Sequence, residues 1–356
     1  MTVKRKSTAE PTAGGTPTDL ANAAVALAVS APWLEPQRRR LAEAWRGTRF
    51  PHALLLRGPA GVGKAALAEW VARLVLCDER QQAPCGACSS CQLLAAGNHP
   101  DFLRAGLEED ARQVKIEAVR ALALALTMKS YRQGYKVAVV APADRMSPGA
   151  ANALLKTLEE PAANTVLILV ADQADRLPAT VASRCQQLRV PRPDPATALH
   201  WLETRESRTD WELCLDLAYG SPLRAVSIAA TGGATLARDM GELLEALAGQ
   251  GRDLISEAER WVKAGAAERV RWVEFWAARA VREAQVGEGS HSLDMRVLHS
   301  TTQRRHIQSL FAVHDSAREA SGWLQRGSVN AQLLVEGLLL DLVRAVRSRP
   351  AEGKNS

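Results

Sequence analysis

A glycine-rich loop near the start of the chain constrains the fold more than any other feature. The apolar run Ala53–Arg57 has the length and composition of a buried strand, and it leads into Gly58-Pro59-Ala60-Gly61-Val62-Gly63-Lys64. A helix is predicted directly afterwards, over 63–76. Strand, loop and helix in this order are typical of a P-loop, in which backbone N–H groups and the helix N-terminus surround phosphate oxygens. Gly58, Gly61, Gly63 and Lys64 are therefore candidate phosphate-binding residues.

Short apolar strands alternate with helical segments through the first half of the chain. Strands are predicted over 53–57, 136–140 and 165–170, and a further helix over 147–158. Such alternation favours a parallel sheet covered by helices on both faces. The run Val190-Pro191-Arg192-Pro193-Asp194-Pro195 interrupts both helix and strand, and it indicates a domain boundary.

The 356 residues are enough for more than one hydrophobic core, and four parts are predicted. Residues 1–30, rich in Thr, Ala, Gly and Pro, are expected to form a disordered arm. Residues 31–191 are expected to form the α/β core, 192–232 a small helical lid, and 233–356 an all-α C-terminal domain. The C-terminal part carries about five amphipathic helices by apolar spacing, including 266–285, 303–325 and 330–347.

Two parts of the hydrolytic machinery of a P-loop ATPase are missing. Ala65 stands where the motif supplies a Ser or Thr hydroxyl as a Mg²⁺ ligand. The predicted strand at 136–140 is followed by Ala141 and Pro142, where an acid is needed, and Asp144 would reach the site only if the loop doubled back. We therefore expect no ATP hydrolysis by this chain alone. The loop either binds ATP and Mg²⁺ without hydrolysis or is kept for its turn geometry.

Four of the six cysteines lie within one short segment, at Cys77, Cys85, Cys88 and Cys91. Thiolates at this spacing can converge on one tetrahedral Zn²⁺, and four protein ligands leave no open position, so the metal would be structural. An iron–sulfur cluster is the alternative, although its usual cysteine runs differ from this one. Cys185 and Cys214 stand apart, and Cys214 is expected to pack in a core.

The charge and hydropathy of the chain exclude few classes of function. The 45 Lys and Arg against 39 Asp and Glu leave a formal charge of +6, which is compatible with nucleic-acid binding without requiring it. The apolar run at 20–29 is short for a membrane span and is interrupted by Asn22. With the clustered cysteines, this predicts a cytoplasmic protein without membrane contact.

Three further stretches carry a resemblance to a known family. They are Asn98-His99-Pro100-Asp101, the run Asn152-Ala153-Leu154-Leu155-Lys156-Thr157-Leu158-Glu159-Glu160-Pro161, and Leu177-Pro178 leading to Ser183-Arg184-Cys185. Together with the P-loop and the cysteine segment after its helix, they resemble the subunits of bacterial DNA polymerase III clamp loaders, of the AAA+ family. The resemblance covers roughly residues 33–231 by motifs and extends to the tail through helical content alone.

The resemblance implies a division of labour between subunits. Motor subunits of the family, tau or gamma, carry a complete P-loop and an acidic strand end, whereas another branch keeps the fold without working parts. Ala65, Ala141 and Pro142 place this chain in the second branch. The resemblance further implies that Arg184 is an arginine finger offered to ATP held by a neighbouring subunit, and that the C-terminal helices join a collar. The implied partners are the delta and tau or gamma subunits, the sliding clamp and primed DNA, in a hetero-oligomer.

Two other functions are weighed against this one. An active tau- or gamma-like ATPase that has merely lost a hydroxyl at Ala65 would still lack acids at 141 and 142. A stand-alone zinc module that binds nucleic acid would need basic and aromatic residues near the cysteines. Residues 77–98 contain Arg80 as their only basic residue and no aromatic residue. Glu159 and Glu160, before Pro161, are expected to fix structure and subunit contacts, and Arg224 is given no nucleotide role because Pro222 and Leu223 shift its register.

Overall fold

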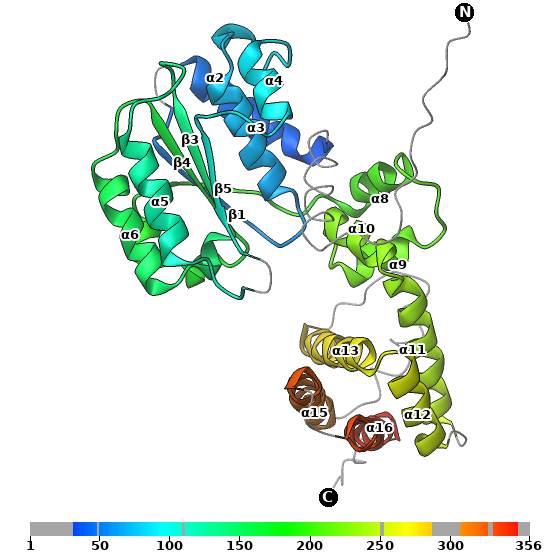
Figure 1. Ribbon diagram of the computed structural model, residues 1–356. Helices are drawn as coiled ribbons and strands as arrows, with labels where there is room; N and C mark the ends of the chain where they lie inside the picture. The colour runs from blue at the N-terminus through cyan, green and yellow to red at the C-terminus, as the bar shows by residue number, and fades with distance from the viewer. Residues whose placement is uncertain are drawn as a thin grey trace, which may run out of the picture. The chain divides into compact units, whose positions relative to one another are not determined.

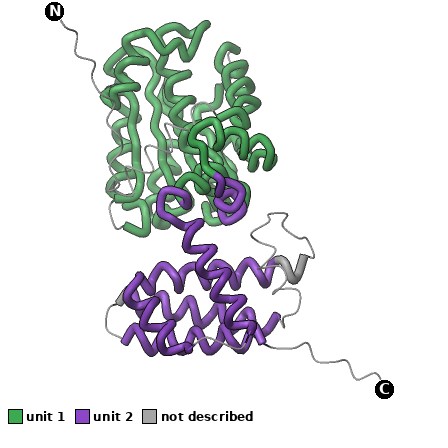
Figure 2. The backbone as a smooth tube through the Cα atoms, turned by 90° about the vertical axis from the view of Figure 1, so that its right-hand side faces the viewer, with its two compact units in different colours: residues 1–208, 218–227 green, residues 209–217, 228–356 purple. Residues whose placement is uncertain are grey.

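The computed structural model describes residues 31–47, 50–108, 111–249, 253–286, 307–326 and 330–347. The predicted arm at 1–30 and the start of the predicted helix 303–325 lie outside these residues. The chain forms two compact units, shown in Figure 2. Unit 1 holds the described residues up to 208 together with 218–227, and unit 2 holds 209–217 and the described residues from 228 onward.

Unit 1 is built on a five-stranded parallel sheet (Figure 1). The strands lie in the order β2-β3-β4-β1-β5. Their bounds are β1 Ala53–Arg57, β2 Phe102–Gly106, β3 Lys136–Ala141, β4 Thr165–Ala171 and β5 Gln186–Arg189. Leu55 of β1 lies beside Leu169 of β4 and Gln187 of β5 in the parallel register. The carboxyl ends of β1, β4 and β5 therefore meet at one edge of the sheet.

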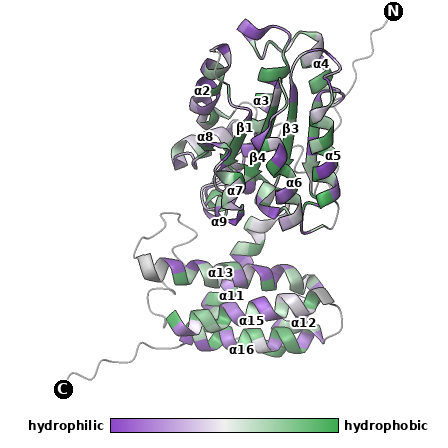
Figure 3. Cartoon of the chain, turned by 90° about the vertical axis from the view of Figure 1, so that its left-hand side faces the viewer, coloured by the Kyte–Doolittle hydropathy of each residue, from purple (hydrophilic) through white to green (hydrophobic). Residues whose placement is uncertain are grey.

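Helices cover both faces of this sheet because the central strands are apolar on both sides. Along β1, Leu54 and Leu56 pack into one core and Ala53 and Leu55 into the other. Figure 3 shows the apolar colour along these central strands. The first face carries η1 Pro32–Leu34, α2 Glu35–Arg46, α3 Lys64–Leu76, η2 Arg80–Gln82 and α4 Ser89–Ala95. The second carries α5 Ile116–Thr127, η3 Ala143–Arg145, α6 Pro148–Glu159, η4 Ala174–Arg176 and α7 Ala179–Ala182.

The predicted parallel α/β core is confirmed, and its two edge strands are the elements that sequence patterning did not find. The three predicted strands are the central ones, β1, β3 and β4. The edge strand β2 is mostly half-buried, and β5 buries a single side chain, Leu188. Neither has the continuous apolar run that identifies a strand buried on both faces.

The predicted lid at 192–232 is shared between the two units. Its helices are α8 Pro195–Glu203, α9 Trp211–Leu217 and α10 Pro222–Ala230. Residues 192–208 and 218–227 belong to unit 1, where Trp33 of η1 stacks edge-on against Trp201 of α8 with ring centroids 5.1 Å apart. The division into a core, a lid and a tail stays a prediction.

Unit 2 is all-helical in its described residues. Besides α9, it contains α11 Gly233–Ala248, α12 Leu254–Ala264, α13 Ala266–Val286, α15 Ile307–Arg326 and α16 Ala331–Arg347. An ion pair between the buried Arg279 and the half-buried Asp216, with nitrogen and oxygen 2.8 Å apart, joins α13 to α9. Within the described part of the chain, no helix combines the length and the apolar character needed to cross a membrane.

Candidate functional site

The glycines of the P-loop are required by close contacts as well as by backbone angles. All three have positive φ, at 154° for Gly58, 77° for Gly61 and 96° for Gly63. A Cβ atom at Gly58 would lie 2.1 Å from the carbonyl oxygen of Val190, and one at Gly61 would lie 2.8 Å from the Cβ of Arg224. The loop is thus enclosed by the chain after β5 and by the start of α10, which leaves no room for a side chain at Gly58 or Gly61, whereas Gly63 is favoured by its backbone angle.

The ammonium group of Lys64, the predicted phosphate-binding cation, makes its polar contacts with other residues of the same chain. Its ammonium group donates hydrogen bonds to the carbonyl oxygens of Gly58, at 2.7 Å, and Pro59, at 2.5 Å. It also forms an ion pair of 2.6 Å with Asp172, the residue that follows β4. Burial lowers the pKa of Lys64, and the carboxylate of Asp172 opposes this effect. An ammonium has three N–H donors, so these contacts use all of them.

No acid stands directly after β3, where a hydrolytic P-loop protein needs one, although another acid approaches the loop. Ala141 ends β3 and Pro142 follows it. The chain then turns through η3, and Asp144 accepts a hydrogen bond of 3.1 Å from the backbone N–H of Gln173. The charge of Asp144 acts on Lys64 only as a minor influence that raises its pKa. The loop therefore does double back, but Lys64 takes Asp172 as its partner.

The four predicted cysteine ligands converge on one point in unit 1. Their sulfur atoms all lie within 4.8 Å of one another, with 3.5 Å between Cys77 and Cys85 and 3.8 Å between Cys77 and Cys88. Tetrahedral Zn²⁺ with Zn–S distances of about 2.3 Å separates its sulfur ligands by roughly 3.8 Å. The spacing of the sulfurs therefore fits a closed structural zinc site made by Cys77, Cys85, Cys88 and Cys91.

Backbone amides and burial act on these thiols in opposite directions. Hydrogen bonds from the N–H groups of Ala87 and Cys88 lower the pKa of Cys85 to about 7, whereas burial raises the pKa of Cys77 and Cys91. The two buried thiols consequently need a nearby positive charge to ionise. A metal cation would supply that charge, and thiolates are the ligands that Zn²⁺ favours.

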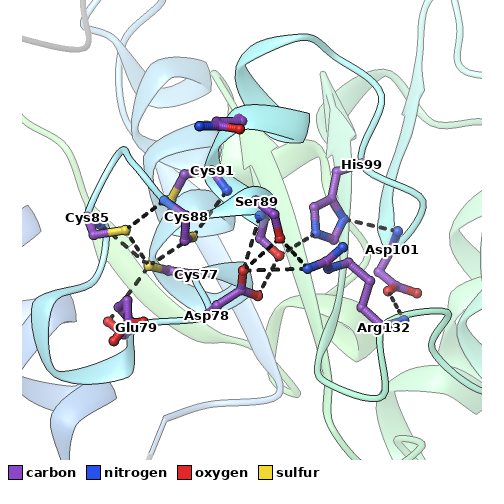
Figure 4. A network of polar contacts seen from close by, with 12 residues as sticks. Cys77, Asp78, Glu79, Cys85, Cys88, Ser89, Cys91, His99, Asp101 and Arg132 are labelled. Atoms are coloured by element: carbon purple, nitrogen blue, oxygen red, sulfur yellow. Dashed lines mark hydrogen bonds and ion pairs between the residues drawn. The ribbon is translucent and has the colours of Figure 1, made fainter.

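A polar network supports the cysteine segment on its inner side (Figure 4). Asp78 accepts hydrogen bonds from the hydroxyl of Ser90, at 2.8 Å, and from that of Ser89, at 3.2 Å. Burial alone would raise the pKa of Asp78, but these bonds hold it at about 2. Arg132 pairs with the same carboxylate at 3.5 Å. The network fixes the chain between Cys77 and Cys91.

The predicted motif at 98–101 extends this network. His99 is buried and lies 3.3 Å from the hydroxyl of Ser90 through Nε2, while its Nδ1 accepts a hydrogen bond from the N–H of Asp101. The carboxylate of Asp101 in turn accepts hydrogen bonds from the backbone N–H groups of Tyr131 and Arg132. The side chains of His99 and Asp101 make structural hydrogen bonds, and these contacts account for the motif at 98–101 without a catalytic role.

Arg184 lies on the surface of unit 1, just after α7. One of its guanidinium nitrogens donates to the carbonyl oxygen of Thr180 at 2.9 Å, and another pairs with Glu159 of α6 at 2.7 Å. Its side chain retains 37% exposure. Two predicted motifs, separated by a strand and two helices in sequence, thus meet at one ion pair, and the guanidinium is held in place while still open to solvent.

Sequence reasoning did not identify Asp172 as part of the loop. A single aspartate after an apolar strand carries no motif, and its role depends on the pairing of β4 with β1. The only sequence signal was its place at the carboxyl end of a strand, where parallel α/β sheets position functional groups.

The sheet and the glycine loop define a P-loop protein that carries a closed four-cysteine site. Comparison with known proteins identifies the family within this class. A family model described as "DNA polymerase III, delta subunit" matches residues 34–194. The chain is 35% identical to DNA polymerase III subunit delta' of Pseudomonas aeruginosa over 297 residues, covering 81% of this chain and 90% of that protein. It belongs to the family of DNA polymerase III subunit delta'.

Other relatives match shorter stretches. The Escherichia coli subunit delta' is 36% identical over 200 residues, covering 55% of this chain and 60% of its own length. DNA polymerase III subunit tau of Salmonella typhimurium is 33% identical over 156 residues, covering 44% of this chain and 24% of its own. A solved structure of a gamma subunit-related protein from Thermotoga maritima covers 88% of this chain and 100% of its own at 17% identity and a TM-score of 0.43.

Proposed function

We propose that this chain is the delta'-type subunit of a DNA polymerase III clamp loader, which helps to load the sliding clamp on primed DNA. The observation that carries the proposal is its family membership, supported by near full-length similarity to a subunit delta'. The proposed partners are the delta and tau or gamma subunits, the clamp and primed DNA, in the cytoplasm. The closed cysteine site would hold a structural Zn²⁺.

The phosphate loop supports a subunit that does not hydrolyse ATP. Ala65 cannot supply the hydroxyl ligand that Mg²⁺ needs, and Ala141 and Pro142 cannot hold the metal or polarise water. Lys64 is also neutralised by Asp172. A phosphate group entering the loop would have to displace this ion pair before it met the lysine.

Arg184 is proposed to act on ATP held by a neighbouring motor subunit. A guanidinium fixed at a subunit boundary stabilises the charge that develops on the transferred phosphoryl group. Glu159 and the carbonyl of Thr180 orient Arg184 in advance, and its partial exposure leaves N–H donors free for phosphate. Orientation by existing contacts lowers the entropy lost when the finger binds.

The test is the ATPase activity of this chain mixed with its cognate motor subunit. Arg184→Ala should assemble normally and slow DNA-stimulated hydrolysis at the site it faces, roughly 10³-fold for that site if it resembles known arginine fingers. Arg176→Ala, an exposed arginine of η4 at the same edge of the sheet, is the matched control and should leave turnover unchanged. Unchanged turnover with Arg184→Ala would remove the finger role. Brisk hydrolysis by the isolated wild-type chain would favour the motor-type alternative.

A further inference from the structure

A pocket of about 520 Å³ lies directly beside the P-loop in unit 1. It is formed at the carboxyl ends of β1, β4 and β5, which are neighbours in the sheet. The residues that line it are Arg57, Gly58, Pro59, Asp172, Ala174, Asp175, Arg189 and Arg192. Three arginines thus surround one cavity whose floor includes the first two residues of the loop.

Two of these arginines are placed side by side by the sheet itself. Arg57 ends β1 and Arg189 ends β5, and they are partners in the parallel register. Neighbouring strands are about 4.8 Å apart, so both positive side chains start from adjacent points. The backbone N–H of Val190 donates a hydrogen bond of 2.8 Å to the carbonyl of Arg57, and this bond holds the ends of β1 and β5 together. Like charges at adjacent positions of a sheet cost stability, so the fold alone does not explain this pair.

The arginines of the pocket outnumber the acids that could neutralise them. Within the described residues, the guanidinium groups of Arg57, Arg189 and Arg192 form no ion pair or hydrogen bond. Asp172 is already paired with Lys64, which leaves the carboxylate of Asp175 as the free acid of the lining. Three guanidinium groups therefore face one uncompensated carboxylate, and the pocket attracts anions.

The third arginine, Arg192, lies beside the chain that precedes α10. A Cβ atom on Gly220 would lie 3.6 Å from the Cδ of Arg192, so the stem of Arg192 runs along this glycine. Gly220 has a φ of 72°, a conformation that other residues rarely adopt. The stem of Arg192 therefore lies against a turn of unit 1, although the residue as a whole is exposed.

We propose that this pocket binds a compact polyphosphate anion through Arg57, Arg189 and Arg192, without using Lys64. Guanidinium groups match phosphate oxygens with two parallel hydrogen bonds. The volume lies within the range of about 300 to 1,000 Å³ that is usual for small-ligand sites. Because the three cations line one pocket, they suit a compact phosphate chain better than an extended nucleic-acid strand. The proposal goes beyond the proposed function, since it concerns the isolated chain and no partner subunit.

The test is calorimetric titration of the full chain with tripolyphosphate at low ionic strength, in Mg²⁺-free buffer without a chelator, so that any metal in the cysteine site is retained. Arg57→Gln and Arg189→Gln should each weaken binding roughly tenfold or more. Arg176→Gln, which removes the same charge from the same edge outside the pocket lining, should change affinity less than about twofold. Titration with ATP reveals whether the base adds affinity, and equal affinities would assign binding to the phosphates alone.

Thermal unfolding without ligand separates loss of the site from loss of the fold. Because Arg57 and Arg189 repel each other, either substitution should leave the melting temperature unchanged or raise it. Arg192→Gln, outside the strands, provides a second variant that should weaken binding without disturbing the sheet. The proposal is overturned if wild-type protein binds no tripolyphosphate, if the pocket variants bind it as tightly as Arg176→Gln does, or if they lose affinity only for a single-stranded oligonucleotide.

Discussion

At the residue scale, the state of Lys64 is decided by one acid that no motif includes. The lysine of the P-loop is buried, and its ammonium is shared between two loop carbonyls and Asp172. Burying an ammonium is costly unless it is paired, and Asp172 provides the pair. The same contact removes from the loop the charge that would attract phosphate.

This arrangement predicts a gain of function from a single substitution. Asp172→Asn keeps the shape of the side chain but removes its charge, so the ammonium of Lys64 becomes available to phosphate. Tripolyphosphate binding, measured by titration, should tighten roughly tenfold, the scale of one charged hydrogen bond. Asp175→Asn removes an equal charge from the same pocket without freeing Lys64, so it should have a smaller effect. Equal effects of the two variants would contradict the role given to Asp172.

At the element scale, the segment between α3 and α4 contains few apolar side chains that could stabilise its conformation by packing. Its conformation depends on the four cysteines and on the hydrogen bonds of Asp78. Burial of Cys77 and Cys91 disfavours their thiolates, so without a cation these two cysteines stay neutral and the four sulfurs cannot all ionise. A bound cation would resolve this conflict and add folding free energy.

Removing one ligand should therefore release the metal and destabilise unit 1. Cys88→Ser is expected to abolish stoichiometric zinc, measured by elemental analysis, and to lower the melting temperature. Cys185→Ala, a cysteine outside the cluster, should retain one zinc per chain. A visible absorption band with iron in place of zinc would show that the alternative cluster is the correct one.

At the scale of the whole molecule, the helical unit exposes apolar side chains that suit an assembly. On α16, Leu333 is 64% exposed and Leu340 47%, whereas Leu338 and Leu342 of the same helix are buried. Phe311 and Trp323 of α15 are also exposed. Apolar surface of this kind marks interaction sites in soluble proteins, which is consistent with a helical collar shared with other subunits.

Charge placed on this surface should block assembly without unfolding the chain. Leu333→Glu combined with Leu340→Glu is expected to abolish co-purification with the motor subunit, because burying two carboxylates in an interface is costly. The melting temperature of the isolated chain should change little, since both side chains are exposed. Ile255→Glu, at 57% exposure on α12, is the matched control. Normal assembly by the double variant would exclude α16 from the interface.

Short-range sequence patterns were enough to predict the local features of this protein. The run of apolar residues before Gly58 and the glycines of the loop specify a strand, a turn and a helix from short-range preferences. The spacing of Cys77, Cys85, Cys88 and Cys91 was sufficient to predict their convergence, because three of them lie within seven residues. The sequence also shows directly that Ala65 lacks the hydroxyl that a P-loop supplies to Mg²⁺.

The tertiary structure alone decided which distant residues meet. Asp172 reaches Lys64 and Arg57 lies beside Arg189 because β1 inserts between β4 and β5. Glu159 reaches Arg184 because α6 packs against α7. Strand order is set by the burial of whole faces and by the closure of long connections, and neither leaves a mark on single polar residues. Helix and strand propensities act over a few neighbours, whereas these contacts depend on the packing of the complete sheet.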